Sequence, residues 1–314
     1  MRVAVLNDIH GVYATSAGIA RLRSRASVDV FTQSEIPLSS LTEYQALIAN
    51  RERTRFPRAV LEQLPNLRII AQTGNHVYHI DMQAAQERGV VVAKATGGFS
   101  RGAAELTLGL MIAVMRGVTA NDAAMRAGGW PSPLGRVLHG KTLGIVGLGH
   151  VGRHVAHLAG AFGMRVLAWG PSLSPEAAAA AGAEHRALDD LLAESDVVSV
   201  HATLSPASRG LLDAARLARM KPTAYLINTA RGPIVDEAAL VEALRTGRLA
   251  GAALDVFDTE PLPVDHPLRR LDGETVVLSP HVGWPTDEAY AGFADAAADV
   301  LLAYLDGRPF PRFN

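Results

Sequence analysis

Short apolar runs alternate with segments of helical periodicity along most of the chain. In the first hundred residues the apolar runs predict five strands, at Arg2–Asn7, Val28–Thr32, Ala46–Ala49, Leu67–Gln72 and Val90–Ala93. Amphipathic segments between them predict helices at Val12–Arg25, Arg58–Leu64 and Asp81–Arg88, with Asp81 as the cap of the last. Strands that alternate with helices are typical of a parallel sheet that carries helices on both faces.

A second alternating series begins at Lys141. Its apolar runs predict strands at Thr142–Val146, Arg165–Trp169, Val197–His201, Ala224–Asn228, Gly251–Val256 and Thr275–Leu278. The Ala-rich stretch Ala177–Ala183 is expected to be helical, and a final helix at Glu288–Leu305 is expected to return to the first domain. We therefore predict an α/β protein of two Rossmann-like, doubly wound domains, made of residues 1–98 plus 288–314 and of residues 99–287.

Two segments between the two alternating series are predicted to contact another domain or another subunit. Ala103–Arg116 is apolar on nearly all sides, which favours a helix buried between domains or at a subunit interface. Asn121–His139 is punctuated by Gly and Pro around Trp130, and we expect it to form an arm that packs on a partner.

Composition narrows the classes of function. With 314 residues, 48% hydrophobic residues and a formal net charge of -1, the chain can bury a large core and has no basic excess for nucleic acid or anionic membranes. It has no cysteine, which excludes disulfides and thiolate chemistry. The start of the chain lacks a signal-like region, and no apolar run approaches the roughly 18 residues of a membrane span. We expect a cytoplasmic protein.

The most informative motif follows the strand Thr142–Val146. Gly147, Gly149 and Gly152 form a GxGxxG turn that leads directly into a helical segment. This strand–turn–helix context is typical of a dinucleotide site, because the first glycine permits the turn, the second admits the pyrophosphate and the third allows close packing of helix and sheet. The helix N-terminus then offers N–H groups to the phosphates.

Three charged residues follow predicted strands of the second series. Arg231 lies in INTARGP, Glu260 in LDVFDTEP and His281 in LSPHVGW. Strand ends of one sheet meet at one edge, where Arg can bind a carboxylate, His can donate a proton, and a carboxylate on the other imidazole nitrogen can orient the ring. Position in the sequence does not exclude that Arg231 lies on the surface, that Glu260 caps a helix and that His281 is a loop residue without a catalytic role.

The chain resembles the D-isomer-specific 2-hydroxyacid dehydrogenase family, including glyoxylate/hydroxypyruvate reductases and phosphoglycerate dehydrogenases. The stretches that carry the resemblance are TLGIVGLGHVGRHVAHLAGAFGMRVLAW, LARMKPTAYLINTARGPIVDEAALVEAL, GAALDVFDTEPLP and SPHVGW. The resemblance implies that Arg231, Glu260 and His281 are catalytic, that Asp255 lies near the nicotinamide amide, and that the active site lies in the cleft between a substrate-binding, flavodoxin-like domain and an NAD(P)-binding Rossmann domain.

Further binding residues are expected around these motifs. For the cofactor they are Gly147, Gly149, His150, Val151, Gly152, Ser172, His201, Ala230 and Asp255. For the substrate they are Arg51, Gly74, Asn75, His76 and Trp284, with Arg53 an alternative to Arg51. The loop at Gly74 departs from the family's usual small residues. Tyr78 and His79 extend a His-rich patch there, but no metal is expected because the family needs none and no completing carboxylates are apparent.

The choice of cofactor stays open. The family's usual aspartate, which accepts from the ribose hydroxyls and repels a 2′-phosphate, falls on Gly170. No Arg or Lys follows at once, although Ser172 can bond either ribose and Arg153 begins the glycine helix. We predict relaxed use of NAD or NADP.

The predicted function is hydride transfer between a nicotinamide cofactor and a small 2-oxo acid or D-2-hydroxy acid. The alternative from another class is a dinucleotide-sensing binding protein, as in corepressors with this fold. A formate dehydrogenase is disfavoured because the long N-terminal extension of that branch is absent from the sequence. The resemblance also implies a homodimer.

Overall fold

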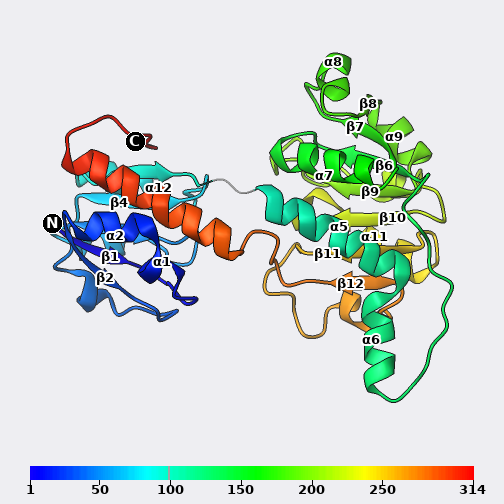
Figure 1. Ribbon diagram of the computed structural model, residues 1–314, viewed down its shortest axis with the longest axis horizontal. Helices are drawn as coiled ribbons and strands as arrows, with labels where there is room; N and C mark the ends of the chain where they lie inside the picture. The colour runs from blue at the N-terminus through cyan, green and yellow to red at the C-terminus, as the bar shows by residue number, and fades with distance from the viewer. Residues whose placement is uncertain (98–99) are drawn as a thin grey trace. The chain divides into compact units, whose positions relative to one another are not determined.

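The computed structural model describes residues 1–97 and 100–314, and the chain divides into two compact units (Figure 1). One unit comprises Met1–Phe99 with Pro285–Asn314, and the other comprises Ser100–Trp284. The chain thus re-enters the first unit at residue 285 rather than at the predicted 288. The predicted boundary between residues 98 and 99 lies outside the described residues.

The first unit is built on a five-stranded parallel sheet. Its order is β2-β1-β3-β4-β5, which is the flavodoxin-like order. The strands are β1 (Arg2–Val5), β2 (Ser27–Val30), β3 (Ala46–Ala49), β4 (Ile69–Thr73) and β5 (Val91–Ala95). β3 and β4 are buried at every position, as expected for central strands covered on both faces.

Helices cover this sheet, and most begin with a side-chain cap. They are α1 (Val12–Thr15), α2 (Ala17–Arg23), α3 (Arg58–Glu62), α4 (Met82–Glu87) and α12 (Asp287–Leu305), with a 3₁₀ turn at Leu38–Leu41. The predicted helix Val12–Arg25 is split because Ser16 leaves the helical conformation and caps α2 through the N–H of Ile19. The predicted cap Asp81 accepts from the N–H of Ala84, and α12 packs against α2, as the expected return to the first domain requires.

The second unit contains a seven-stranded parallel sheet in the order β12-β11-β10-β9-β6-β7-β8. Its strands are β6 (Thr142–Val146), β7 (Arg165–Trp169), β8 (Glu184–His185), β9 (Val197–Val200), β10 (Tyr225–Asn228), β11 (Gly251–Leu254) and β12 (Val276–Leu278). The order reverses direction at β6 and β9, which places a topological switch point between them. The sequence missed β8, which has only two residues.

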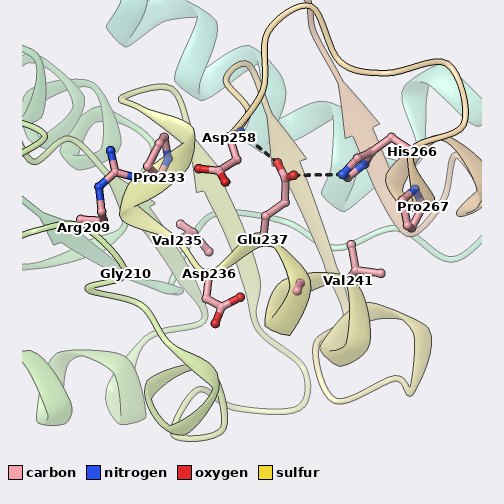
Figure 2. Close-up of a pocket in the computed structure, with 11 residues that line it drawn as sticks. Arg209, Gly210, Pro233, Val235, Asp236, Glu237, Val241, Asp258, His266 and Pro267 are labelled. Carbon is pink, nitrogen blue, oxygen red and sulfur yellow. Dashed lines mark hydrogen bonds and ion pairs between the residues drawn. The ribbon is translucent and has the colours of Figure 1, made fainter.

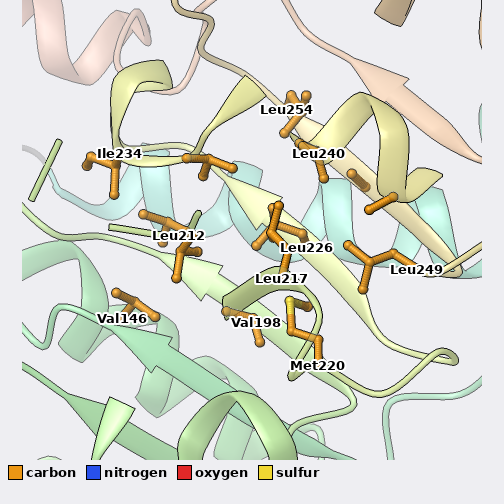
Figure 3. Close-up of a cluster of buried hydrophobic side chains, with 14 of the residues drawn as sticks. Val146, Val198, Leu212, Leu217, Met220, Leu226, Ile234, Leu240, Leu249 and Leu254 are labelled. Carbon is orange, nitrogen blue, oxygen red and sulfur yellow. The ribbon is translucent and has the colours of Figure 1, made fainter. Parts of the chain in front are cut away.

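Residues of alternate parity in these strands enter two separate cores. On β10, Leu226 enters the core shown in Figure 3, while Tyr225 and Ile227 enter the core on the opposite face. The first face is covered by α9 (Leu188–Glu194), α10 (Ala214–Leu217) and α11 (Glu237–Arg245), and the other by α5 (Ser100–Arg116), α7 (His150–Ala161) and α8 (Pro175–Ala179). Two 3₁₀ turns, Gly232–Ile234 and Pro267–Arg270, complete the unit. Each face thus has a continuous apolar core.

The apolar segment Ala103–Arg116 forms most of α5 and packs within its own unit. Its contacts are with α7, β10 and β11, so the unit's own sheet buries residues such as Met111. Packing on the unit's own sheet accounts for the apolar residues that face it, and the predicted subunit interface stays a prediction. Within the described residues no single helix is long and apolar enough to span a membrane, although α5 and α6 (Val118–Arg126), bent by 63°, pass that test as a pair.

The predicted arm at Asn121–His139 is helical in its first part. α6 begins after Gly117 in the left-handed conformation and runs to Arg126, supported by the Arg126–Asp122 ion pair one turn apart. No glycine or proline lies within Val118–Arg126, and the helix ends just before Gly128. Residues 127–137 then have no regular secondary structure and carry the exposed Trp130 and Leu134.

Candidate active site

In the glycine turn after β6, the first and third glycines are sterically required and the second is not. Gly147 has a φ of +103°, and a Cβ there would lie 2.5 Å from the backbone nitrogen of Ala202, after β9. A Cβ at Gly152 would lie 2.3 Å from the carbonyl oxygen of Gly147. At Gly149 a Cβ would meet nothing within 4 Å, so this position is open toward solvent rather than packed.

This arrangement fits a dinucleotide. α7 begins at His150 with no side-chain cap, which leaves its first N–H groups without the usual side-chain acceptor. A cavity of about 530 Å³ adjoins the turn. It is lined by Gly147, Leu148, Gly149, Arg153, Trp169, Gly170, Pro171, Ser172, Leu173, Ala177, His201, Ala202, Thr203, Ser205, Ala207, Ser208 and Leu211. The switch point therefore combines uncapped helix N–H groups, which suit a phosphate, with an adjoining hollow.

His201 enters this cavity as a neutral side chain. Burial of its imidazole lowers the pKa of His201 to about 4, and its Nε2 lies 2.8 Å from the hydroxyl of Ser199. At neutral pH the ring thus offers hydrogen bonding rather than a positive charge. Of the other expected cofactor residues, Ser172 lines the cavity, His150 and Val151 begin α7, and Ala230 follows β10.

Gly170 lies at the end of β7, where the family's aspartate is expected. A Cβ there would meet only the Cβ of Leu173, at 3.3 Å, so a small side chain fits with a slight adjustment. Arg153 is exposed, yet it lines the same cavity as Gly170 and Ser172. The exposed side chain of Arg153 therefore also borders the nucleotide cavity.

Arg231 follows β10 in a turn that Asn228 organises. The side chain of Asn228 accepts from the N–H of Ala230 at 3.0 Å and donates to the carbonyl of Arg231 at 3.0 Å. Next to it, a Cβ on Gly232 would lie 2.0 Å from the backbone carbonyl carbon of Phe257. Only glycine permits this approach, which packs the segment of Arg231 against the loop that carries Glu260.

His281 and Glu260 form a hydrogen-bonded pair. The Nδ1 of His281 lies 2.7 Å from Oε2 of Glu260, while Oε1 of Glu260 accepts from the N–H of Phe257 at 3.0 Å. Burial raises the pKa of Glu260, but the hydrogen bonds from His281 and Phe257 and the charges of His281 and Arg231 outweigh it, so the pKa is lowered. The ionised carboxylate orients the ring and leaves Nε2 for proton transfer.

In the first unit Arg51 and Arg53 have different contacts. The guanidinium of Arg51 lies over the glycine loop, because a Cβ at Gly74 would lie 2.3 Å from its Nη1. Arg53 instead donates to the hydroxyl of Tyr290 at 2.6 Å and to the carbonyl of Asn7 at 3.2 Å. Arg51 is thus the arginine that adjoins the expected substrate loop.

The remaining predicted substrate residues flank these groups in their own units. Asn75 is exposed and His76 partly exposed after β4, and Trp284 is partly exposed three residues after His281. His79 of the His-rich patch is buried against Gln72, with 3.1 Å between His79 Nε2 and Gln72 Oε1, and burial lowers its pKa. Across residues 1–97 and 100–314, no three His, Cys, Asp or Glu side chains gather in a possible metal site.

Comparison with known proteins identifies the family. The model for "D-isomer specific 2-hydroxyacid dehydrogenase, NAD binding domain" matches residues 108–283. The chain belongs to the D-isomer-specific 2-hydroxyacid dehydrogenase family. It is 41% identical over 259 residues to the glyoxylate reductase of Thermofilum pendens, covering 80% of this chain and 76% of that protein.

The chain is also similar to two proteins whose names refer to phosphoglycerate. The chain is 43% identical over 270 residues to the D-3-phosphoglycerate dehydrogenase of Mycobacterium tuberculosis, covering 85% of this chain but 50% of that protein. The crystal structure of phosphoglycerate oxidoreductase from Vibrio cholerae O395 superposes with a TM-score of 0.84 at 32% identity, covering 98% of this chain and 99% of that one.

The match confirms the predicted enzyme class. This family member is an oxidoreductase that interconverts 2-oxo acids and 2-hydroxy acids with a nicotinamide cofactor, and it contains the family's NAD-binding domain. The comparisons therefore support the enzyme interpretation rather than the dinucleotide-sensing alternative. The two parallel sheets confirm the predicted α/β fold class.

In this dehydrogenase Asp255 has a positioning role that the sequence did not reveal. Its Oδ1 accepts from the hydroxyl of Ser279 at 2.6 Å and the N–H of Val282 at 2.9 Å, and its Oδ2 accepts from the N–H of Gly283 at 2.9 Å. These bonds hold the loop in which His281 has a φ of +56°, a conformation that non-glycine residues rarely adopt. Asp255 therefore holds the backbone directly after His281 and the side chain of Ser279, two residues before it.

Proposed function

We propose that this dehydrogenase reduces glyoxylate or a closely related small 2-oxo acid. The observation that carries the proposal is the 2.7 Å contact of His281 Nδ1 with Glu260, because it presents the opposite ring nitrogen as a proton donor. The likeness to a named glyoxylate reductase over 76% of that protein's length supports a small substrate.

In the proposed reaction Arg231 binds the substrate carboxylate and polarises the carbonyl. His281 donates its proton to the carbonyl oxygen as that oxygen gains charge, which yields the hydroxyl of the product. Glu260 stabilises the imidazolium before the transfer and keeps the ring oriented. Ala230 and Asp255 would hold the nicotinamide, which in its reduced form would supply the hydride. In the oxidative direction His281 accepts the proton.

Substrate binding in the first unit is assigned to Arg51 and the loop Gly74–His76. The guanidinium of Arg51 lies against Gly74 and brings a positive charge to the loop, which suits a carboxylate. Asn75 and His76 are larger than the usual residues of that loop and are proposed to limit the substrate's size. Trp284 is proposed to contact the substrate after His281. These assignments favour small acids over bulky ones.

The decisive experiment is a matrix of 2-oxo acids against NADH and NADPH, read as kcat/KM. Glyoxylate, pyruvate, hydroxypyruvate and a bulky aryl 2-oxo acid form a series of increasing size. We expect the two smallest acids to rank highest with either cofactor. A preference for the aryl acid, or no oxidation of the reduced nicotinamide with any acid, would overturn the proposed substrate class.

For the cofactor we propose use of both NADH and NADPH. Gly170 leaves the ribose site without the carboxylate that repels a 2′-phosphate, and Arg153 lines the same cavity with an exposed guanidinium. Gly170→Asp should therefore lower kcat/KM for NADPH roughly tenfold to a hundredfold and leave NADH nearly unchanged, because only NADPH carries the repelled charge.

Two further measurements test the predicted use of both cofactors. Arg153→Ala should lower kcat/KM for NADPH alone, whereas His157→Ala, one turn further along α7 and also exposed, should affect neither cofactor. A wild-type preference for NADH of about a thousandfold would contradict dual use and indicate that another group replaces the aspartate.

We also propose that the enzyme is a homodimer that buries the segment after α6. Trp130 is 85% exposed, Leu134 is fully exposed and Val137 is 62% exposed, which is unusual for apolar side chains close together in sequence. Light scattering at micromolar concentration should give a dimer for the wild type and a monomer for Trp130→Lys with Leu134→Lys. Val264→Lys, at an apolar residue 92% exposed on another loop, is the matched control and should remain dimeric. A monomeric wild type would refute the proposal.

A further inference from the structure

Glu237, the first residue of α11, contacts both ends of the loop that carries Glu260. Its Oε2 accepts from the N–H of Asp258 at 3.2 Å, and its Oε1 lies 3.0 Å from Nε2 of His266 (Figure 2). Its side chain is only 17% exposed and that of His266 only 19%. One carboxylate thus joins the start of the loop and its end to the same helix.

The anchoring continues beyond the carboxylate on both sides. The Nδ1 of His266 accepts from the N–H of Leu268, which fixes the ring at the start of the 3₁₀ turn Pro267–Arg270. The helix end that carries Glu237 is itself capped by Asp236, which accepts from the N–H of Ala239 at 3.0 Å. Glu237 therefore projects from a fixed helix end to a fixed turn.

The anchored backbone is the part of the loop that positions Glu260. The N–H of Phe257 donates to Glu260, and the N–H of the next residue, Asp258, donates to Glu237. On the opposite side the same backbone packs against Gly232, where a Cβ would lie 2.4 Å from the nitrogen of Asp258. Movement of this turn would shift Glu260 relative to the 2.7 Å contact with His281.

We propose that Glu237 is a positioning residue for the hydride-transfer reaction, which acts through Glu260 on the proton held by His281. The inference rests on the proposed roles of Glu260 and His281. Glu237 touches neither substrate nor cofactor in this account. Glu237 keeps the Glu260 carboxylate within hydrogen-bonding distance of the imidazole. Removing the Glu237 carboxylate should therefore have the same effect as weakening the Glu260–His281 contact.

A first-turn carboxylate also stabilises a helix through its dipole, and that role predicts a different result. A dipole effect lowers the melting temperature and leaves the catalytic pH profile unchanged. A positioning effect lowers kcat and moves the alkaline limb of the reduction profile to lower pH, because a less stabilised imidazolium loses its proton earlier. The two roles are therefore separable by kinetics.

The test compares Glu237→Ala, Glu237→Gln and Glu260→Gln with glyoxylate and NADH as probes. Glu237→Ala should lower kcat about tenfold, with KM for glyoxylate and Kd for NADH within about twofold of wild type. The midpoint of the alkaline limb of its kcat pH profile should move toward the midpoint measured for Glu260→Gln. Glu237→Gln keeps an acceptor for Asp258 and should recover part of the loss. Because Glu237 borders a hollow of about 530 Å³, these changes leave no closed cavity.

A double variant and a matched control complete the design. Combining Glu237→Ala with Glu260→Gln should cost no more than about twofold beyond Glu260→Gln, since both changes act on one contact. Glu242→Ala removes a carboxylate of the same helix that pairs with Arg245, and it should behave as wild type. If Glu237→Ala does not fold, Glu237→Gln and His266→Ala provide the same comparison.

The outcomes separate the catalytic roles proposed for Glu260 and His281 from the positioning role proposed for Glu237. A normal kcat and midpoint for Glu260→Gln would refute the proposed catalytic roles and this inference with them. A clear loss for Glu260→Gln, together with a wild-type pH profile for Glu237→Ala or fully multiplied losses in the double variant, would refute the positioning role alone.

Discussion

Replacing His281 with Ala should lower kcat for 2-oxo acid reduction by about two orders of magnitude or more. The imidazole is the group that Glu260 orients, at 2.7 Å, and Asp255 accepts from the two backbone N–H groups that follow His281. Without it, water must protonate the oxygen that gains charge. Binding of NADH, followed by fluorescence, should be unchanged because the glycine turn and its cavity do not involve His281.

The control for this variant is His157→Ala, which removes an exposed imidazole from α7. It should keep the wild-type rate, so that a loss in His281→Ala reflects position and not the general removal of a histidine. The kcat of His281→Ala should also lose the alkaline limb of its pH profile. A near-normal rate, or an unchanged pH profile in His281→Ala, would contradict its role as the proton donor.

The sequence predicted the parts of this site that depend on local chain geometry. The glycine turn was recognisable because Gly147, Gly149 and Gly152 follow a strand and precede a helix, and a Cβ would clash with neighbouring backbone at Gly147 and Gly152. The strands were predictable because their apolar runs are nearly continuous, as expected for strands buried on both faces. Both kinds of signal lie within a few neighbouring residues.

Contacts across long sequence separations were not predictable in the same way. The bonds of Asp255 join residues 24, 27 and 28 positions apart, and their existence depends on how β11 and β12 align. Similarly, Arg51 and Arg53 lie in one charged run, and only the fold distinguishes the arginine over Gly74 from the one bonded to Tyr290. A pattern of residue types contains neither distinction.

Arg231→Ala should lower kcat/KM for the 2-oxo acid by about three orders of magnitude, equivalent to about 4 kcal/mol of transition-state stabilisation. The guanidinium is assigned two tasks, binding the carboxylate through a two-pronged hydrogen bond and polarising the carbonyl, and Ala performs neither. Arg231→Lys keeps the charge but not the planar fork, so it should recover only part of the loss. Steady-state kinetics with glyoxylate and NADH measure both variants.

The turn that presents Arg231 makes this test specific to the side chain. Asn228 shapes that turn through the N–H of Ala230 and the carbonyl of Arg231, bonds that no side-chain change at Arg231 removes. Added guanidinium or ethylguanidinium should therefore raise the rate of Arg231→Ala, while the control Arg209→Ala, which removes an exposed guanidinium, should need no rescue. If Arg231→Lys equalled wild type, charge alone would suffice and the bidentate assignment would be wrong. If Arg231→Ala kept a wild-type kcat/KM, substrate binding would have to rest on Arg51 and the loop at Gly74.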